Sequence, residues 1–545
     1  MSHYHISELQ FGIVREVDGA SVRMEATALS CMHLGTEHAV ELGSFVLIAA
    51  PQSDLMATIS SIQVVERQTK EGPQEIKVVT CTLVGFLRDG TTFERGIERY
   101  PTVGTPGYLL AESALTAMFS SANKGIILGT RCQRGGGLEH ASIDRLFGRH
   151  TAVLGTSGSG KSWAVASILQ SAMKSMPHTR FLFLDIHDEY RSAFPQDFAR
   201  LGRKVKHVKS SELRLPYWLL TIDELEALFV SSEHAASNQS ALLRSMIQKL
   251  KVDNVGRTGI PVGLITVDTP IPYPHLSLIA ELTRLNEEMV AGAKSGEKQG
   301  PFFGKLSNLI TRLTTRAGDP RYGFLFPTKE SSPTAFTGIL HTLFGTEPQT
   351  QMTILDLSGL PSEVLSIIVG IIARLCFEYK YWEKLPGELP LTLILEEAHN
   401  YIPRTDASRH EICLERIEKI AKEGRKYGVG LLVISQRPSE VSETILSQCA
   451  NFIALRLTNP NDQQYVRRLL PDFLAVAVDM LPYLRTGEAI ISGEAVDIPT
   501  RIHFIPPDPV PRSQDVQYMT AWTAGLPPLY DLDATVGRWL RRERE

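Results

Sequence analysis

The spacing of hydrophobic and polar positions changes along the chain and predicts more than one kind of structure. Within residues 1–105, short apolar and β-branched runs are separated by turn residues such as Asp18-Gly19. The clearest runs are Phe45–Ile48, Met56–Val65 and Ile76–Leu87. Several short strands at this spacing favour a small N-terminal β-barrel.

From residue 149 onward, apolar strands alternate with helices, which is typical of a parallel α/β sheet. We expect strands at Thr151–Leu154, Phe181–Leu184, Met352–Leu357, Leu391–Leu395, Gly430–Ile434, Phe452–Leu457 and Glu488–Ile491. This α/β core covers residues 149–210 and 346–505. Residues 211–345 interrupt it and predict a mostly helical insertion, in which Thr221-x-x-Glu224 forms a capping box that opens a helix.

Three remaining segments carry a weaker pattern. Residues 106–148 are expected to be a connector, and Ala293–Phe303 is expected to be an exposed loop. The C-terminal tail, 506–545, is rich in proline at first and ends in a charged helical stub, Val536–Glu545.

Length and composition narrow the class of protein. A chain of 545 residues is too long for one hydrophobic core, and 43% hydrophobic with 21% charged residues is ordinary for a globular protein. The net charge of -4 argues against coating nucleic acid by bulk charge, but it allows a local basic lining. The most apolar run, Val364–Ala373, is too short to span a membrane, and the N-terminus lacks a secretory signal. Six cysteines without C-x-x-C spacing fit reduced, mostly buried thiols, so we expect a cytoplasmic protein without a membrane partner.

One glycine-rich segment predicts a nucleotide site. It comprises Gly155, Thr156, Ser157, Gly158, Ser159, Gly160, Lys161 and Ser162 and matches the P-loop pattern in full. It follows an apolar strand and opens a helix, which is the context this motif requires. Backbone N–H groups would face the phosphates, Lys161 would reach the β- and γ-phosphates, and Ser162 would ligate Mg²⁺. The expected cofactors are ATP and Mg²⁺.

Two acids directly follow the apolar strand Leu391–Leu395. In P-loop ATPases the first acid, here Glu396, holds Mg²⁺ through water, and the second, here Glu397, polarises the attacking water. Position 396 is Glu where Asp is commonest, and the longer side chain would still reach metal-bound water. The alternative is that both acids cap the next helix as solvated side chains.

Polar residues at other strand ends are further candidates. Gln436, after Gly430–Ile434, is a candidate sensor of the γ-phosphate or else a loop amide. Asp185, after Phe181–Leu184, either supports the metal or terminates its strand. His187 alone is more often structural than catalytic.

Several segments together resemble the HerA/FtsK branch of P-loop motors, and HerA most closely. Besides the P-loop they are Arg149-His150, Asp185-x-His187-x-Glu189-Tyr190, Leu355–Pro361, Glu396–Asn400, Gly424–Gly428, Ser435–Pro438, Phe93–Gly96 with Tyr100-Pro101, and Leu484–Ala489. The P-loop alone identifies only the superfamily, whereas this set in this order is specific. The resemblance covers nearly the whole chain.

The resemblance implies a RecA-like P-loop ATPase core assembled as a homo-hexamer, with ATP sites between subunits and double-stranded DNA in the central channel. HerA proteins are DNA translocases or helicases that act with a nuclease in end resection, or with a nuclease or NAD-hydrolase effector in anti-phage defence. The partner usually docks on the N-terminal barrel. Ring ATPases complete the site with an arginine from the neighbouring subunit. Arg149 and Arg425 occupy positions where the family carries such arginines, and Arg437 is a third candidate, although Arg425 also fits a solvated position in a charged helix.

Two other functions stay open. The first is an ATP-regulated ring scaffold that switches a partner enzyme, with DNA movement incidental. The second is a P-loop enzyme of another class, such as a kinase or an unfoldase, which the extended HerA/FtsK-like segments disfavour. The densest basic run, Arg203–Lys209, either lines a DNA channel or is a solvated face.

Overall fold

The computed structural model describes residues 9–33, 36–50, 54–69, 72–88, 92–110, 125–132, 137–196, 204–230, 236–257, 259–291, 297–326, 333–345, 347, 349–383, 388–405, 407–470, 478–513, 517–525 and 531–541. The chain forms two compact units. The first unit comprises residues 1–175, 435–439 and 446–510, and the second comprises 176–434, 440–445 and 511–545. No described helix is long and apolar enough to cross a membrane.

An antiparallel barrel forms the N-terminal part of the first unit. Its strands are β1 (Gln10–Asp18), β2 (Ser21–Ala26), β5 (Phe45–Ala49), β6 (Asp54–Thr69), β7 (Gly72–Arg88), β8 (Thr92–Arg95) and β9 (Pro106–Leu109). They pair in the order β2-β1-β9-β5-β6-β7-β8, and a further pairing of β2 with β7 closes the ring. A separate hairpin joins β3 (Ser30–His33) to β4 (Thr36–Ala39). The predicted barrel is confirmed.

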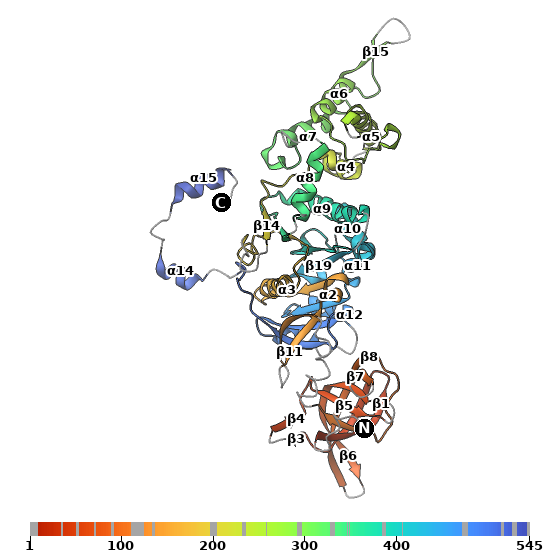
Figure 1. Ribbon diagram of the computed structural model, residues 1–545, viewed down its shortest axis with the longest axis vertical. Helices are drawn as coiled ribbons and strands as arrows, with labels where there is room; N and C mark the ends of the chain where they lie inside the picture. Colours follow the sequence, from red (N-terminus) through yellow and green to blue (C-terminus); the bar gives the residue numbers. More distant parts are fainter. Residues whose placement is uncertain are drawn as a thin grey trace. The chain divides into compact units, whose positions relative to one another are not determined.

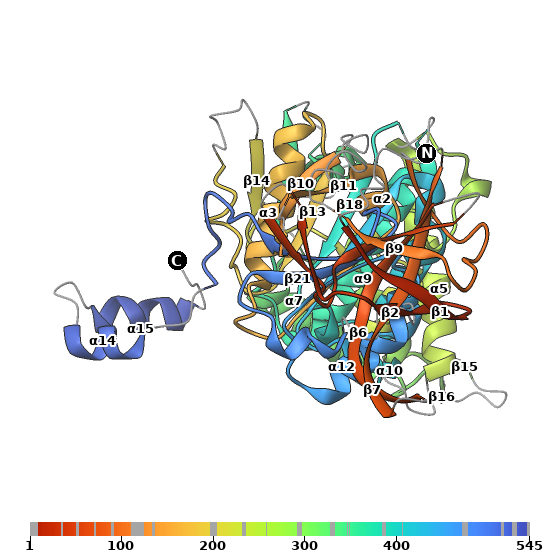
Figure 2. The same cartoon turned by 90° about the horizontal axis from the view of Figure 1, so that it is seen from below.

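Side chains that alternate between inward and outward positions along each strand give the barrel its core. Inward positions such as Phe11, Met24, Val46 and Val79 are fully buried and form one apolar core. The strands β6 and β7 pair over their whole lengths and lie side by side in both views (Figures 1 and 2). Strand β9 extends the sheet beyond the predicted boundary at residue 105, because its inward Gly107 and Leu109 are buried while it pairs with β1 and β5.

Arg95, the last residue of β8, holds a turn of the adjoining sheet. Its guanidinium donates hydrogen bonds to the carbonyl oxygens of Gly493 at 2.5 Å and Asp497 at 2.9 Å, and to that of Val496. A charged donor that satisfies several carbonyls at once makes stronger bonds than a neutral group. The Phe93–Gly96 segment therefore has a structural role in the first unit.

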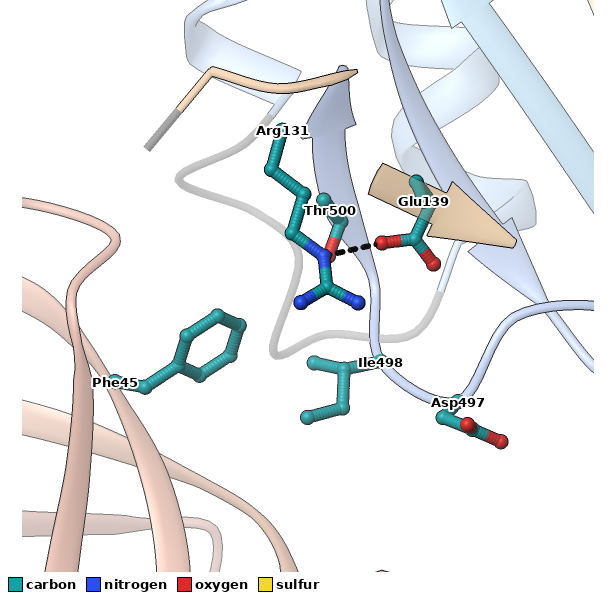
Figure 3. Close-up of a pocket in the computed structure, with 6 residues that line it drawn as sticks. All are labelled: Phe45, Arg131, Glu139, Asp497, Ile498 and Thr500. Carbon is teal, nitrogen blue, oxygen red and sulfur yellow. Dashed lines mark hydrogen bonds and ion pairs between the residues drawn. The ribbon is translucent and has the colours of Figure 1, made fainter. Parts of the chain in front are cut away.

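Apolar contacts accompany the hydrogen bonds that Arg95 donates. Phe45 of the barrel packs with Met56 and Ile498. Figure 3 shows Phe45 facing Ile498 and the Arg131–Glu139 ion pair across a cavity of about 10 Å³. A cavity of this size has room for about one water and not for a nucleotide.

The rest of the first unit is a mixed sheet. Its strands are β10 (Gly125–Arg131), β11 (Leu138–Ser142), β12 (Thr151–Leu154), β20 (Asn451–Leu455), β21 (Glu488–Gly493) and β22 (Thr500–Phe504). Only β12 and β20 are parallel, and the run β20-β21-β22-β10-β11 is antiparallel. The helices of this part are α2 (Ile143–Gly148), α3 (Lys161–Ser175) and α12 (Pro460–Leu469). The predicted connector 106–148 thus contributes strands and a helix to folded elements.

The second unit contains the parallel sheet that the alternation predicted. Strands β19 (Val429–Ser435), β18 (Leu391–Leu395), β13 (Phe181–Asp185), β17 (Thr350–Asp356) and β14 (Lys204–Val208) pair in that order, all parallel. Four of them, β19, β18, β13 and β17, are almost entirely buried, as expected when helices cover a parallel sheet. Helices α9 (Ser362–Trp382) and α10 (Ala407–Glu423) pack together. Gly370 allows this close approach, because a Cβ at that position would lie only 3.1 Å from the backbone of Cys413. The α/β fold class is confirmed.

The helical insertion is also present in the second unit. Its helices are α4 (Ile222–Phe229), α5 (Ala236–Asp253), α6 (His275–Glu287), α7 (Ser307–Gly318) and α8 (Pro333–Phe344). Thr221 and Glu224 form the predicted capping box at the start of α4. The Glu224 carboxylate is fully buried and accepts hydrogen bonds from Arg374 of α9 at 2.7 and 3.0 Å. This buried ion pair links the insertion to the helices over the sheet.

Some predicted segments differ from the structure. The expected loop Ala293–Phe303 includes β16 (Glu297–Gln299), which pairs with β15 (Met289–Ala291) to form an exposed hairpin. The basic run Arg203–Lys209 contains the edge strand β14, because Val205 and Val208 are buried against β17. The tail contains α14 (Tyr518–Ala524) and α15 (Leu532–Arg541). Five of the six cysteines are buried, as the sequence predicted.

Candidate nucleotide-binding site

The P-loop lies in the first unit between β12 and α3. Strand β12 is fully buried and delivers the chain to Gly155, and α3 begins at Lys161. Gly158 and Gly160 have φ angles of +70° and +92°, a region that favours glycine. The glycines at these positions therefore let the backbone turn where a phosphate would lie.

The start of the loop is fixed to two neighbouring strand ends. The Gly155 N–H donates to the carbonyl of Ser435 at 3.2 Å, and the Thr156 N–H donates to the carbonyl of Arg456 at 3.0 Å. The first contact places the Ser435–Pro438 segment beside the loop. Gln436, which directly follows Ser435, is half-buried there, so the loop and the candidate sensor are brought together.

The middle of the loop retains donors for a phosphate ligand. The backbone N–H groups of Gly158 and Gly160 donate to no described residue, and the buried Ser159 hydroxyl has no described partner. Lys161, at the helix N-terminus, is only 6% exposed. Free backbone donors, a helix N-terminus and a shielded lysine fit the phosphates of a nucleotide and a hard cation beside them.

The acidic pair lies in the second unit at the end of β18. Glu396 is 2% exposed and Glu397 is 3% exposed, which excludes the alternative of two solvated carboxylates. The Glu396 carboxylate accepts a hydrogen bond from the Ile186 N–H at 3.0 Å, and its backbone carbonyl accepts one from the Tyr401 hydroxyl at 2.7 Å. The first of these bonds joins the end of β18 to the end of β13, and the second fixes the turn that follows β18.

Glu397 has an unusual backbone. Its φ of 45° and ψ of 49° place it in the left-handed region, which costs a residue with a Cβ about 1–3 kcal/mol. His399 Nδ1 lies 3.4 Å from the Glu397 carboxylate. A strained, buried carboxylate directly after a parallel strand fits a group held for chemistry.

Asp185 has the strand-terminating role among its two alternatives. Its carboxylate accepts hydrogen bonds from the backbone N–H groups of His187 at 3.1 Å, Glu189 at 3.3 Å and Tyr190 at 3.0 Å. These bonds fold the turn after β13. A part in the metal shell stays a prediction. His187 itself is exposed.

The candidate arginines differ in their surroundings. Arg149 ends α2 and pairs with Glu494 at 3.5 Å. Arg425 is exposed in a 3-10 turn, Gly424–Tyr427, and its side chain makes no hydrogen bond or ion pair to the described part of the chain. Arg437 is exposed beside Gln436. Of the three arginines, Arg425 is the one whose side chain is most available to contact a neighbouring molecule.

Comparison with known proteins bears on all of these segments. A family model described as "Helicase HerA, central domain" matches residues 141–376, and one described as "Helicase HerA-like C-terminal" matches residues 384–503. The DNA double-strand break repair helicase HerA of Saccharolobus solfataricus is 25% identical, with 89% of this chain and 91% of that protein covered. The corresponding protein of Sulfurisphaera tokodaii is also 25% identical, with 88% and 89% covered. The chain belongs to the HerA family.

Similar solved structures include VirB4 of Thermoanaerobacter pseudethanolicus. It is 18% identical, with 73% of this chain and 98% of that chain covered, at a TM-score of 0.48. The plasmid coupling protein TrwB in complex with ADP and Mg²⁺ is 11% identical, with 70% and 95% covered, at a TM-score of 0.43.

HerA membership makes the chain an ATP-dependent enzyme of the helicase class. The matched central domain contains the P-loop and Asp185, and the matched C-terminal part contains the acidic pair, Arg425 and Gln436. Sequence reasoning identified these motifs but gave no role to Arg456, whose carbonyl and side chain both contact the HerA P-loop. No local signal marks this residue, because it follows an ordinary buried strand.

Proposed function

We propose that this HerA-family chain is an ATP-driven translocase or helicase acting on double-stranded DNA as a hexameric ring. The observation that carries the proposal is the complete P-loop, folded with free donors and a shielded Lys161. Two relatives that the chain matches over most of their length are named as DNA double-strand break repair helicases. An enzyme with this loop converts ATP hydrolysis into movement only if a carboxylate can activate water, and the buried Glu397 supplies one.

Each of these residues has a separate role in the proposed reaction. Lys161 and the loop N–H groups bind the phosphates, and Ser162 with Glu396 would hold Mg²⁺, which neutralises charge on the phosphates when bound. Glu397 orients and deprotonates the attacking water. Gln436, joined to the loop through Ser435, senses whether a γ-phosphate is present. We propose that all of these groups act on the same nucleotide.

We further propose that a separate effector enzyme, a nuclease or an NAD hydrolase, docks on the N-terminal barrel in DNA processing or anti-phage defence. This part rests on the sequence resemblance. A ring that only assembles and regulates such an effector, with DNA movement incidental, is the alternative.

The test is steady-state ATPase activity of the full chain with and without linear double-stranded DNA. We expect DNA to increase turnover, with Glu397→Gln protein as the blank for contaminating ATPases. A triplex-displacement assay on the same DNA then distinguishes movement from binding. ATPase activity that is indifferent to DNA would contradict the translocase proposal and favour the regulatory ring.

Replacing Arg425 by alanine tests whether this arginine acts across the subunit boundary. We expect nucleotide affinity to persist and hydrolysis to fall by about 10³-fold, as when a transition-state arginine is lost. Lys426→Ala, in the same exposed turn, is the matched control and should hydrolyse ATP normally.

Mixing provides the decisive measurement. In rings formed from Arg425→Ala and Lys161→Ala subunits, some interfaces combine an intact loop with an intact arginine. Part of the ATPase activity should therefore return on mixing. No recovery at any ratio would mean that Arg425 acts within its own subunit or only structurally.

A further inference from the structure

We propose that Arg456 and the Thr486-Gly487 turn are positioning residues that hold the P-loop in its phosphate-binding conformation from outside the loop. This inference deepens the proposed function and rests on nucleotide binding at Gly155–Ser162. Both groups lie far from the loop in sequence and reach it through the sheet of the first unit.

One loop carbonyl receives two donors from these elements. The Gly158 carbonyl oxygen accepts a hydrogen bond from Arg456 Nη2 at 3.0 Å and another from the Thr486 hydroxyl at 3.3 Å. Gly158 adopts a φ of +70° in the bend of the loop. Fixing its carbonyl fixes the orientation of a peptide that glycine would otherwise leave mobile.

The next peptide is fixed by the backbone of Gly487. The Gly487 N–H donates to the Ser159 carbonyl at 3.0 Å. Because the C=O and N–H of a trans peptide point in opposite directions, this bond turns the Gly160 N–H away from Gly487. That N–H is one of the donors left for a phosphate, so Gly487 sets its direction.

The two backbones approach too closely for side chains. A Cβ on Gly160 would lie 2.8 Å from the Gly487 nitrogen. Gly160 and Gly487 both have positive φ angles, +92° and +81°. The close approach and the positive φ explain why glycine stands at position 487 within Leu484–Ala489, one of the segments that carry the family resemblance.

A buried carboxylate makes the turn rigid. The Glu488 N–H closes the turn onto the Arg485 carbonyl at 3.0 Å. The fully buried Glu488 carboxylate accepts hydrogen bonds from the Arg485 N–H at 3.0 Å and from Arg485 Nε and Arg501 Nη2, both at 2.6 Å. Burial alone would raise the pKa of Glu488, but the bonds from Arg501 and Arg485 lower it to about 2. The turn therefore keeps its charge network at any physiological pH.

Arg456 is placed by strand pairing. It follows β20, which pairs in parallel with β12 so that Ala454 lies opposite Leu154, the last residue before the loop. Its own carbonyl accepts from both the N–H and the hydroxyl of Thr156, at 3.0 and 2.9 Å. Arg456 therefore contacts the loop at its start through the backbone and at its bend through the guanidinium.

The experiment measures the affinity of the full chain for fluorescent ADP with Mg²⁺, and the thermal unfolding midpoint without nucleotide. We expect Arg456→Ala and Thr486→Val each to weaken ADP affinity about tenfold, with unfolding midpoints close to wild type. Arg456→Lys should recover part of the affinity, because its ammonium can still donate to the carbonyl. The double variant should lose less than the product of the single losses, because both donors serve one carbonyl.

Arg468→Ala is the matched control, because Arg468 is an exposed arginine on α12 whose side chain makes no hydrogen bond or ion pair to the residues that the structure describes. The ADP affinity of this variant should be unchanged. Wild-type affinity in both test variants would overturn the inference while leaving the proposed function intact. A lower unfolding midpoint in step with the lost affinity, without recovery by Arg456→Lys, would overturn it as well, since that marks a merely structural role. Failure of the wild-type chain to bind ADP would overturn the proposed function itself, and this inference with it.

Discussion

Replacing Glu397 by glutamine is expected to lower the rate of ATP hydrolysis by about 10²–10⁴-fold while nucleotide binding persists. The amide has nearly the same shape as the carboxylate but cannot accept the proton of the attacking water. Glu397 is 3% exposed and sits in a left-handed backbone conformation that only a fixed local structure would maintain. Single-turnover hydrolysis and ADP affinity, measured on the same protein, separate the chemical step from binding.

A second glutamate provides the comparison for this prediction. Glu415, an exposed residue of α10, should tolerate the same change to glutamine without loss of turnover. Glu396→Gln is expected to raise the Mg²⁺ concentration needed for activity, because its carboxylate is assigned to the metal. Full turnover in Glu397→Gln protein would show that another group activates the water.

Local patterns predicted the elements that precede the candidate site residues. Strand β12 and strand β18 have the boundaries that their apolar runs predicted, because polar residues, glycine or proline bound each run and both faces are buried. The capping box at Thr221 formed as predicted, because its two side chains lie three residues apart and need no distant partner. Motifs that are contiguous in sequence could therefore be predicted from the sequence alone.

Contacts between distant segments could not be read in the same way. The antiparallel pairing of β10 with β22 joins residues more than 300 positions apart, such as Gly129 and Phe504. The three donors on the outside of the P-loop, Arg456, Thr486 and Gly487, are also distant from it in sequence. The resemblance marked the segment Leu484–Ala489 but gave it no role, and no local pattern marks Arg456. The basic run around Lys206 looked like a surface, because the alternation of two buried valines with charged residues is short.

Burial decided one question that sequence left open. A carboxylate pair after a strand is compatible with solvated helix caps or with a catalytic site. The near-complete burial of Glu396 and Glu397 and the bond from the Ile186 N–H remove the first reading. For Asp185 the same kind of observation favours the structural reading, because three backbone N–H groups already occupy its carboxylate.

Replacing Lys161 by alanine is expected to weaken nucleotide affinity by at least about 10²-fold and to abolish hydrolysis. Lys161 is 6% exposed at the N-terminus of α3, where its charge is shielded from water and acts more strongly on a phosphate than an exposed lysine would. A ligand present at 100 times its dissociation constant stabilises the folded state by about 2.7 kcal/mol. Wild-type protein should therefore show a clear rise of the thermal unfolding midpoint with Mg-ADP, and Lys161→Ala protein should show almost none.

Lys174→Ala is the matched control for that measurement, because Lys174 lies in the last turn of the same helix and is exposed. Its midpoint should rise with Mg-ADP as in the wild type. A lower midpoint of Lys161→Ala without nucleotide would indicate lost packing of the lysine stem, and affinity would then be compared at a temperature where both proteins are folded. An undiminished nucleotide shift in Lys161→Ala would place the phosphates elsewhere than in this loop and would remove the basis of the ATPase mechanism.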